Sequence, residues 1–215
     1  EKWRMGKVIK NIMNNNIPGG YSFPYWGPFI FRTKVSRTEL TWISRFIDKK
    51  HQNKSAKDKL MIGATGKEFN VSWEWLKSSV DLMKDLQPYF NLYREAHFTY
   101  YNRRIDNVDC ISSWINFMKA GEVNPQHTHN DCTLSCVLYL KVPKQLKKEN
   151  ADHNSKSAGP GCISFHYSEP REHSITQYSL FPEERDLLIF PSNVRHEVLP
   201  FKSKGQRISI GANFK

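Results

Sequence analysis

The chain lacks the long apolar run that a membrane-spanning helix requires. No stretch of its 215 residues approaches the roughly 20 consecutive apolar residues of a bilayer span, and no signal-peptide pattern opens it. These absences argue against a transmembrane protein. We therefore expect a globular protein without a membrane partner.

Cysteine is scarce and carries no motif. The residues Cys110, Cys132, Cys136 and Cys162 lie in strand-like segments without the C-x-x-C spacing of a zinc or redox site. We interpret them as core thiols in a reducing compartment and expect a cytoplasmic protein. Because thiolate is a favoured zinc ligand, its absence from the histidine cluster described below favours iron.

Acidic residues are outnumbered, with 21 Asp and Glu against 32 Lys and Arg, and the formal net charge is +11. Such a balance attracts anions, from small dicarboxylates to nucleic acid. The basic residues are spread along the chain, however, and form no run interleaved with aromatics. We therefore favour a solvated basic surface over a nucleic-acid interface.

Short strands separated by turns dominate the second half of the chain. Alternation and turn signals predict them over residues 110–119, 134–142, 161–167, 174–180, 186–190, 196–200 and 206–214. This density predicts a sandwich or barrel that encloses a site between two sheets. We expect a mainly β protein with N-terminal helices (α+β), in which residues 1–109 support a β core over residues 110–215 within one compact domain.

The first half of the chain predicts supporting elements rather than chemistry. A strand is expected over 29–35, and a helix from Ser36, where Glu39 three residues on completes a capping box. A second helix is expected after Ser72, with Pro88 kinking or restarting it.

A polar, Lys-rich segment, residues 144–160, interrupts the strands. It is long for a hairpin loop and has little apolar surface to bury. We predict a mobile loop that forms part of the rim of the site.

Histidines cluster in Asn124-Pro-Gln-His-Thr-His-Asn-Asp131, and His196 follows between two later strands. Residues i and i+2 of an extended segment point the same way, so His127 with His129, or His129 with Asp131, can face one metal ion. A His-x-(Asp or His) pair with one distant His is typical of a facial iron site with three open positions. His196 takes part in either arrangement, and Asp131 can alternatively fix the tautomer of one imidazole.

A polar face follows on the last predicted strand. Alternation places Arg207, Ser209 and Asn213 on one face and apolar residues on the other. A guanidinium that points into an apolar core needs an anion, and it binds carboxylate through two parallel hydrogen bonds, to which a nearby hydroxyl adds a third. Tyr139, on the strand 134–142, can join Arg207 on the same carboxylate.

These motifs form a set: Gly121-x5-His127-x-His129, Ser135-Cys-Val-Leu-Tyr139-Leu, Gly161-x-Ile-x-Phe165, Phe190-Pro-Ser, and His196 followed by Arg207-x-Ser209. As a set they resemble the Fe(II)/2-oxoglutarate-dependent oxygenases, and more narrowly the small prolyl-hydroxylase-like members that phages and bacteria often encode. The resemblance covers residues 110–215. For a phage-encoded member, the cytoplasm expected above is that of the host.

The resemblance implies a double-stranded β-helix, a cupin-like jelly roll. It also implies Fe(II) held by the His-x-(Asp or His) pair and His196, and 2-oxoglutarate with its far carboxylate on Arg207, Ser209 and Tyr139. O2 then drives decarboxylation to succinate and CO2 and hydroxylation of a substrate, with ascorbate as a reductant. The prolyl-hydroxylase likeness makes that substrate a protein or peptide side chain.

One departure from the family concerns the metal ligands. Alignment from Gly121 puts His129 where most of the superfamily has Asp. That leaves either a three-histidine site of His127, His129 and His196, with these residues catalytic, or a shifted register that uses Asp131. We favour the first, in which the dianionic cosubstrate balances the ferrous charge.

Two interpretations from other classes stay open. One is a 2-oxoglutarate oxygenase that acts on nucleic acid held by the basic surface, and salt-sensitive oligonucleotide binding would favour it. The other is a cupin-like binding protein whose site is inactive.

Overall fold

The computed structural model describes residues 27–38, 40–41, 57–58, 63–71, 82–106, 108–169 and 172–215. Its strands are β1 (Phe31–Lys34), β2 (Lys57–Asp58), β3 (Lys67–Val71), β4 (Cys110–Lys119), β5 (Asn124–His127), β6 (Leu134–Lys141), β7 (Ile163–His166), β8 (Gln177–Leu180), β9 (Asp186–Pro191), β10 (Arg195–Val198) and β11 (Gln206–Phe214). The helices that pack on the strands are α3 (Leu82–Tyr101) and α4 (Lys144–Ala151). Every strand predicted in the second half is present within a few residues.

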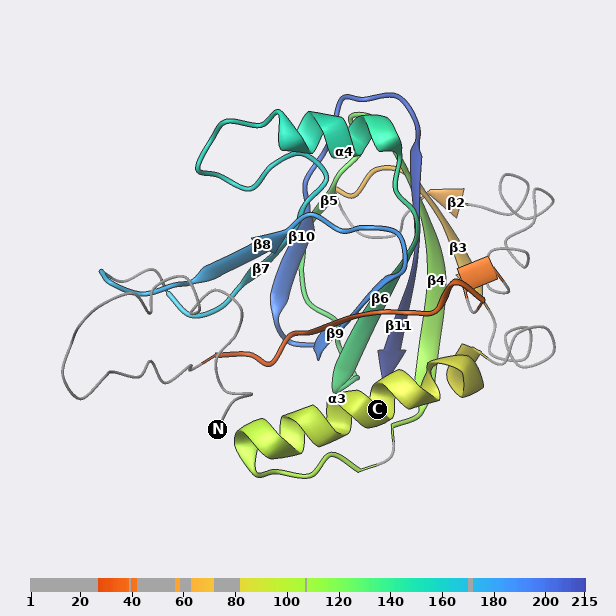
Figure 1. Ribbon diagram of the computed structural model, residues 1–215, viewed down its shortest axis with the longest axis vertical. Coiled ribbons are helices and arrows are strands. Elements are labelled where there is room, and N and C mark those ends of the chain that lie inside the picture. The colour runs from red at the N-terminus through yellow and green to blue at the C-terminus, as the bar shows by residue number, and fades with distance from the viewer. Residues whose placement is uncertain are drawn as a thin grey trace.

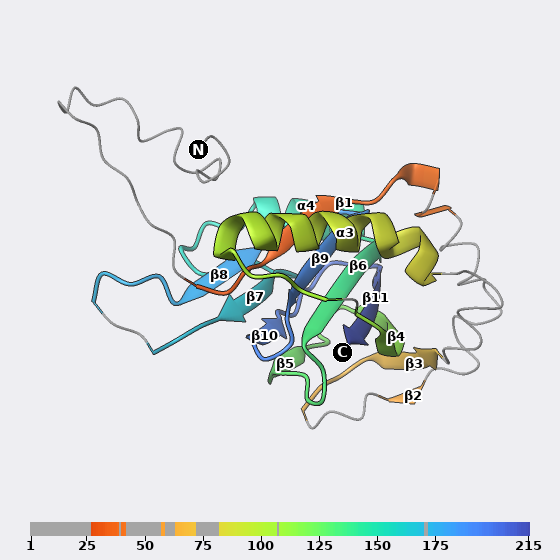
Figure 2. The same ribbon diagram turned by 90° about the horizontal axis from the view of Figure 1, so that it is seen from below.

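The strands form two antiparallel sheets that face each other (Figures 1 and 2). The major sheet has the order β1-β9-β6-β11-β4-β3-β2, and the minor sheet the order β5-β10-β7-β8. From β4 onward the chain passes back and forth between the two sheets, which is the winding of a jelly roll. The predicted double-stranded β-helix is therefore confirmed.

Helix α3 covers the outer face of the major sheet, as Figure 2 shows. Its residues Leu86, Phe90 and Tyr93 are buried against apolar side chains of the sheet. The sheet residues of this core alternate along their strands: Ile115, Phe117, Leu138, Leu187, Ile189, Ile208, Ile210 and Phe214. This packing fixes which face of each strand is left for the space between the sheets.

Helix α3 runs through Pro88 to Tyr101 instead of restarting at the proline. Proline removes one helical hydrogen bond, but the packing of Leu86, Phe90 and Tyr93 holds the helix on the sheet. The capping residue Glu39 and the expected start of this helix after Ser72 lie outside the described residues. In the described part of the chain, no helix is long and apolar enough to cross a membrane.

The predicted mobile loop over 144–160 is wrong for its first half, which forms α4. The segment Lys-Gln-Leu-Lys-Lys-Glu-Asn-Ala consists mostly of good helix formers. Leu146 is fully buried and packs with Met118, Val198 and Phe201. Helix α4 therefore closes one end of the barrel, at the top of Figure 1.

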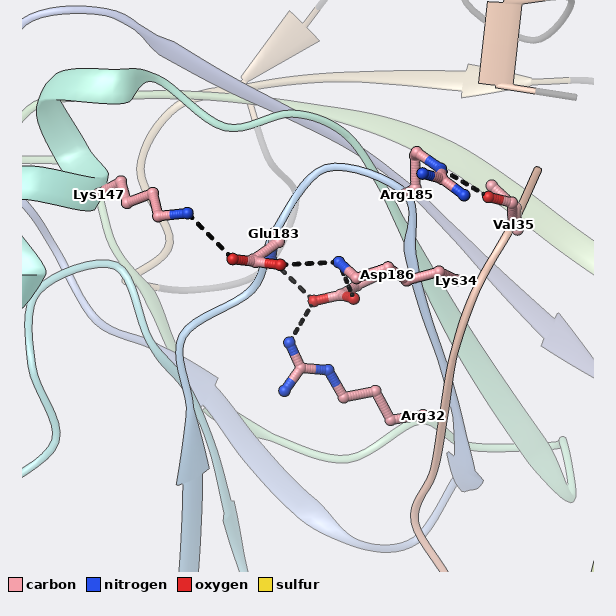
Figure 3. A network of polar contacts seen from close by, with 7 residues as sticks. All are labelled: Arg32, Lys34, Val35, Lys147, Glu183, Arg185 and Asp186. Atoms are coloured by element: carbon pink, nitrogen blue, oxygen red, sulfur yellow. Dashed lines mark hydrogen bonds and ion pairs between the residues drawn. The ribbon is translucent and has the colours of Figure 1, made fainter. Parts of the chain in front are cut away.

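An ion-pair network joins β1, β9 and α4 (Figure 3). Buried Asp186 lies 2.6 Å from Arg32 Nη2 and 3.0 Å from Lys34 Nζ. Glu183 lies 2.9 Å from Lys34 Nζ and 3.1 Å from Lys147 Nζ of α4. The network fastens the N-terminal strand and the helix to the same turn of the barrel.

Candidate functional site

Three imidazoles converge where β5 meets β10. His127 on β5 pairs in register with His196 on β10, and His129 follows two residues after His127. The ring centroid of His196 lies 4.3 Å from that of His127 and 5.1 Å from that of His129. One ligand nitrogen of each ring lies within 4.8 Å of the other two. This spacing suits three donors around one metal ion.

Backbone carbonyls orient two of the rings. His127 Nδ1 lies 2.7 Å from the Pro125 carbonyl oxygen, and His196 Nδ1 lies 2.9 Å from that of Val194. A carbonyl only accepts, so each Nδ1 carries the hydrogen and each Nε2 keeps its lone pair. This is the outer hydrogen bond that metal-ligating histidines commonly make.

His129 is held by packing and by its backbone. The centroid of its ring lies 5.3 Å from that of the Trp114 indole. The backbone N–H of His129 donates to the Ser192 carbonyl oxygen over 3.0 Å. The indole in turn needs Gly211, because a Cβ there would lie 2.5 Å from the indole Cε2. Gly211 therefore makes the space in which Trp114 lies beside His129.

Burial keeps two of the imidazoles neutral. It lowers the pKa of His129 to about 4 and that of His196 to about 3, and the nearby His127 adds to both effects. A neutral imidazole is the form that binds metal. At neutral pH both rings are ready to act as ligands without losing a proton.

Asp131 is not part of the cluster. Its side chain is exposed, and its backbone has φ of +59°, in the left-handed region. The strand-like alternation that would align Asp131 with His129 is therefore broken in this turn. Of the two arrangements left open by the sequence, the structure brings together His127, His129 and His196.

Arg207 on β11 is a buried cation. It is only 4% exposed, and burial lowers its pKa. Its Nη1 donates to the Gly161 carbonyl over 3.0 Å and its Nη2 to Met118 Sδ. Among the described residues no carboxylate pairs with it. Its remaining donors are free for an anion that enters from the cavity.

Two hydroxyl groups lie near Arg207, that of Ser209 on the same strand and that of Tyr139 on the neighbouring strand β6. The Arg207 guanidinium carbon sits 5.7 Å from the Tyr139 ring centroid, and Ser209 pairs in register with Tyr139. Burial raises the pKa of Tyr139 to about 12, with Arg207 opposing the shift. The phenol therefore stays protonated and can donate a hydrogen bond. Ile208 and Ile210 face α3 instead, as the alternation of β11 predicted.

One cavity of about 360 Å³ connects these groups. Its walls include the three histidines, Tyr139, Arg207 and Ser209, together with Trp114 and Asn116 of β4. No residue of 144–160 lines it, so the predicted role of that segment at the rim is also not observed. Arg195, the cation next to His196 on β10, is exposed and points away from the cavity that His196 lines.

The cavity residues fit the two groups that the sequence motifs imply. Three imidazole nitrogens that converge at the wall of a cavity suit a divalent transition metal such as Fe(II). A buried guanidinium without a carboxylate partner is costly unless an anion joins it, and 2-oxoglutarate supplies a carboxylate. The chain thus offers one donor set for a cation and, in the same cavity, one for an anion.

Sequence reasoning missed three contributors to the site. Trp114 and Asn116 share the cavity face of the predicted strand 110–119, so alternation could have found them. Ser192 stands in the Phe190-Pro-Ser motif, which alone does not indicate what its hydroxyl contacts. Its Oγ donates to the Cys132 carbonyl oxygen over 2.5 Å, and its backbone N–H donates to the Thr133 carbonyl oxygen over 3.0 Å. These two hydrogen bonds hold the turn that follows His129.

The fold and the donor set define a jelly-roll protein with a candidate mononuclear metal centre. Residues 112–213 match the family described as "Putative 2OG-Fe(II) oxygenase". This segment, which spans the barrel from β4 to β11, therefore matches the family that the motifs of the sequence resemble. No curated protein matches the chain in a sequence comparison.

Solved structures share the fold. A prolyl-4-hydroxylase from Pseudomonas putida superposes with a TM-score of 0.59 at 13% identity, over 86% of this chain and 91% of that one. A prolyl hydroxylase from Trichoplax adhaerens, in complex with a hypoxia inducible factor oxygen degradation domain peptide fragment, gives 0.58 at 14%, over 87% and 83%. A viral collagen prolyl hydroxylase from Paramecium Bursaria Chlorella virus-1 gives 0.54 at 11%, over 87% and 96%.

Proposed function

We propose that the protein is an Fe(II)- and 2-oxoglutarate-dependent hydroxylase whose substrate is a protein or peptide side chain. The observation that carries this proposal is the joint lining of one cavity by three convergent imidazoles and a buried, carboxylate-free arginine. Three imidazoles alone would also suit a zinc site, and a buried arginine alone would also suit a structural role. Together they provide for a metal ion and for an anionic cosubstrate beside it.

In this proposal His127, His129 and His196 hold Fe(II) through the nitrogens that converge on one point. The metal, when bound, activates O2 for the oxidative decarboxylation of 2-oxoglutarate and the hydroxylation of the substrate. The hydrogen bonds from His127 and His196 to backbone carbonyls keep both rings in the ligating tautomer. Three neutral ligands leave the metal charge to be balanced by the dianionic cosubstrate.

Arg207, Ser209 and Tyr139 bind the far carboxylate of 2-oxoglutarate. The guanidinium has donors left beyond its contacts to Gly161 and Met118. The Tyr139 phenol remains protonated, because burial raises its pKa, and Ser209 adds a hydroxyl from the same face. Because the pocket around Arg207 is buried, each charge-assisted hydrogen bond is stronger than it would be in water.

A peptide is the substrate class that we favour. Prolyl hydroxylases are among the solved structures that share this fold, and one of them was solved with a peptide fragment. The net charge of +11 makes nucleic acid the class against which the proposal is tested.

The experiment supplies Fe(II), 2-oxoglutarate, ascorbate and O2 together with a proline-containing peptide library or single-stranded oligonucleotides. Mass spectrometry then detects the gain of one oxygen atom, and succinate is measured in parallel. We expect an oxygen on a peptide, with at least one succinate formed for each oxygen that the peptide gains. Modified oligonucleotide with unmodified peptide would reassign the substrate, and absence of Fe(II)-dependent succinate would reject the enzyme.

A further inference from the structure

Helix α4 lies behind Arg207, outside the cavity. Its Leu146 belongs to the small core that also contains Met118, and Arg207 Nη2 donates to the sulfur of that methionine. None of the α4 residues reaches the cavity. Although α4 does not line the cavity, it can still influence the orientation of the Arg207 guanidinium through Met118.

The first connection is a hydrogen-bonded chain from Asn150 to Arg207. Asn150 Nδ2 donates to the Pro160 carbonyl over 2.9 Å and lies 3.4 Å from Cys162 Sγ. Between these two residues stands Gly161, whose carbonyl accepts from Arg207 Nη1 over 3.0 Å. One amide therefore holds both neighbours of the carbonyl that orients the guanidinium.

The second connection is steric. Gly161 has φ of +72°, and a Cβ at this position would lie 2.8 Å from Leu146 Cδ1. The turn rests on a fully buried leucine, so it cannot move toward the helix. The Gly161 N–H also donates to the Pro200 carbonyl over 3.3 Å. Its position is thus determined from both sides.

The third connection fixes the neighbouring loop. The Glu149 carboxylate accepts the N–H of Lys202 over 2.9 Å and that of Ser203 over 2.7 Å. Two charge-assisted bonds to backbone N–H groups hold the segment that follows Pro200. Helix α4 therefore holds the turn at Gly161 through Asn150, and it holds the segment after Pro200 through Glu149.

We propose that Asn150 and Leu146 of α4 are positioning residues for Arg207. They set the Gly161 carbonyl and Met118, which hold one side of the guanidinium so that its other donors face the cavity. The inference rests on the proposed function for its consequence, the affinity for 2-oxoglutarate. Without these contacts the guanidinium loses a fixed orientation and the carboxylate loses a preorganised partner.

The test compares Asn150→Ala and Asn150→Leu, which both remove the donor while Leu keeps the volume. Lys148→Ala is the matched control, because Lys148 is exposed on the same helix and its ammonium pairs with Asp152, which lies outside the contacts to Gly161. Three quantities are measured: the anaerobic affinity for 2-oxoglutarate, the affinity for Fe(II), and kcat with KM. The hydrogen exchange rate of the Arg207 guanidinium is measured by NMR in the absence of cosubstrate, and its signals are assigned by their loss in Arg207→Lys. This rate reports how firmly the guanidinium is held.

We expect both Asn150 variants to weaken 2-oxoglutarate binding and raise its KM about threefold to tenfold, the loss typical of one net hydrogen bond. Fe(II) affinity and kcat at saturation should stay within about twofold, guanidinium exchange should accelerate, and Lys148→Ala should match the parent. Parental 2-oxoglutarate affinity in a folded Asn150 variant, or equal losses of Fe(II) and 2-oxoglutarate affinity, would overturn the inference. If the parent itself bound no 2-oxoglutarate, the proposed function would fail, and unchanged guanidinium exchange would then separately reject the positioning role.

Discussion

Two backbone carbonyls determine which nitrogen His127 and His196 present to the cavity. Because Pro125 and Val194 accept from the Nδ1 atoms, both rings are fixed in one tautomer before any metal arrives. His129 has a different support, the Trp114 indole. At the residue scale the candidate centre is therefore preorganised by the backbone on two sides and by aromatic packing on the third.

The first prediction concerns the anion partner of Arg207. Arg207→Ala should abolish measurable 2-oxoglutarate binding and leave Fe(II) affinity within about twofold, because Arg207 lies outside the imidazole cluster. Arg207→Lys should restore little, since an ammonium lacks the planar fork of donors. Arg195→Ala, an exposed cation on the adjacent outer face, is the control. Parental cosubstrate affinity in Arg207→Ala, measured by anaerobic calorimetry, would show that another group holds the carboxylate.

The second prediction separates the two candidate ligand sets. His127→Ala should lower Fe(II) affinity severely, whereas Asp131→Ala, at an exposed position outside the cluster, should lower it no more than about threefold. The Asp131 carboxylate is exposed and is not one of the converging ligand atoms, so its removal should leave the three imidazole donors in place. Fe(II) titration of both variants is the measurement. A loss confined to the Asp131 variant would overturn the three-histidine assignment.

The third prediction concerns the contact between Gly211 and Trp114. Gly211→Ala forces a Cβ within 2.5 Å of the indole and should destabilise the fold by about 1–3 kcal/mol, as overpacking does. The displaced indole should also loosen His129 and weaken Fe(II) binding. Thermal unfolding and Fe(II) titration check both effects. Adding Trp114→Phe should recover part of the stability, and strictly additive losses would contradict a clash between these two residues.

At the scale of elements, strand pairing brings distant ligands together. The pairing of β5 with β10 puts His127 opposite His196, although 69 residues separate them by number. The turn between β9 and β10 also accepts the N–H of His129 at Ser192. The pairing of β5 with β10 and the turn before β10 therefore position the backbone of all three histidines. A shift in the register between β5 and β10 would separate the rings.

The network of Figure 3 gives the fourth prediction. Hydrogen bonds from Lys34 and Lys147 lower the pKa of Glu183 to about 2, from an ordinary value of 4.5. Because the folded-state pKa lies below the unfolded one, this stabilisation is fully present above about pH 4.5 and is lost as the pH falls toward 2. The side chain is 44% exposed, so the effect is modest, about 0.2–1 kcal/mol for each pair.

Glu183→Gln should therefore lower the melting temperature slightly at pH 6, and its difference from the parent should shrink between pH 4.5 and 2. Glu169→Gln, at an exposed acid of the β7–β8 hairpin, serves as the control for loss of a negative charge. A difference between Glu183→Gln and the parent that is constant over this pH range would show that the ion pairs contribute nothing.

Alternation allowed most strands of the barrel to be predicted from the sequence, because the face that packs on α3 is consistently apolar. Arg207 and Ser209 could be recognised in the sequence of β11 because they are polar and alternate with the apolar residues Ile208 and Ile210. Helix α4 could not be predicted in this way, since Leu146 is its one buried residue and no apolar stripe marks it. The sequence favoured His127 over Asp131 but left both possible, because a spacing of two residues fits either; the left-handed turn that takes Asp131 out of the cluster is not visible in that spacing.

At the scale of the whole molecule, one helix supports a face of the barrel, a second helix closes one end, and the interior holds a buried cation, Arg207. Helix α3 supports the major sheet from outside, and α4 closes the end near Arg207 (Figure 1). The net charge of +11 favours the approach of a dianion from solvent. Under the proposed function, this charge would favour the entry of the anionic cosubstrate into the cavity that Arg207 and the imidazoles line.

The central claim is that the imidazole cluster and Arg207 act as one Fe(II)- and 2-oxoglutarate-dependent centre. The most direct measurement is succinate formation after the protein is loaded anaerobically with Fe(II) and 2-oxoglutarate and then exposed to O2. The account predicts slow uncoupled turnover that requires Fe(II) and is lost in both His196→Ala and Arg207→Ala. Binding of Zn²⁺ alone, with no decarboxylation under any condition, would contradict it.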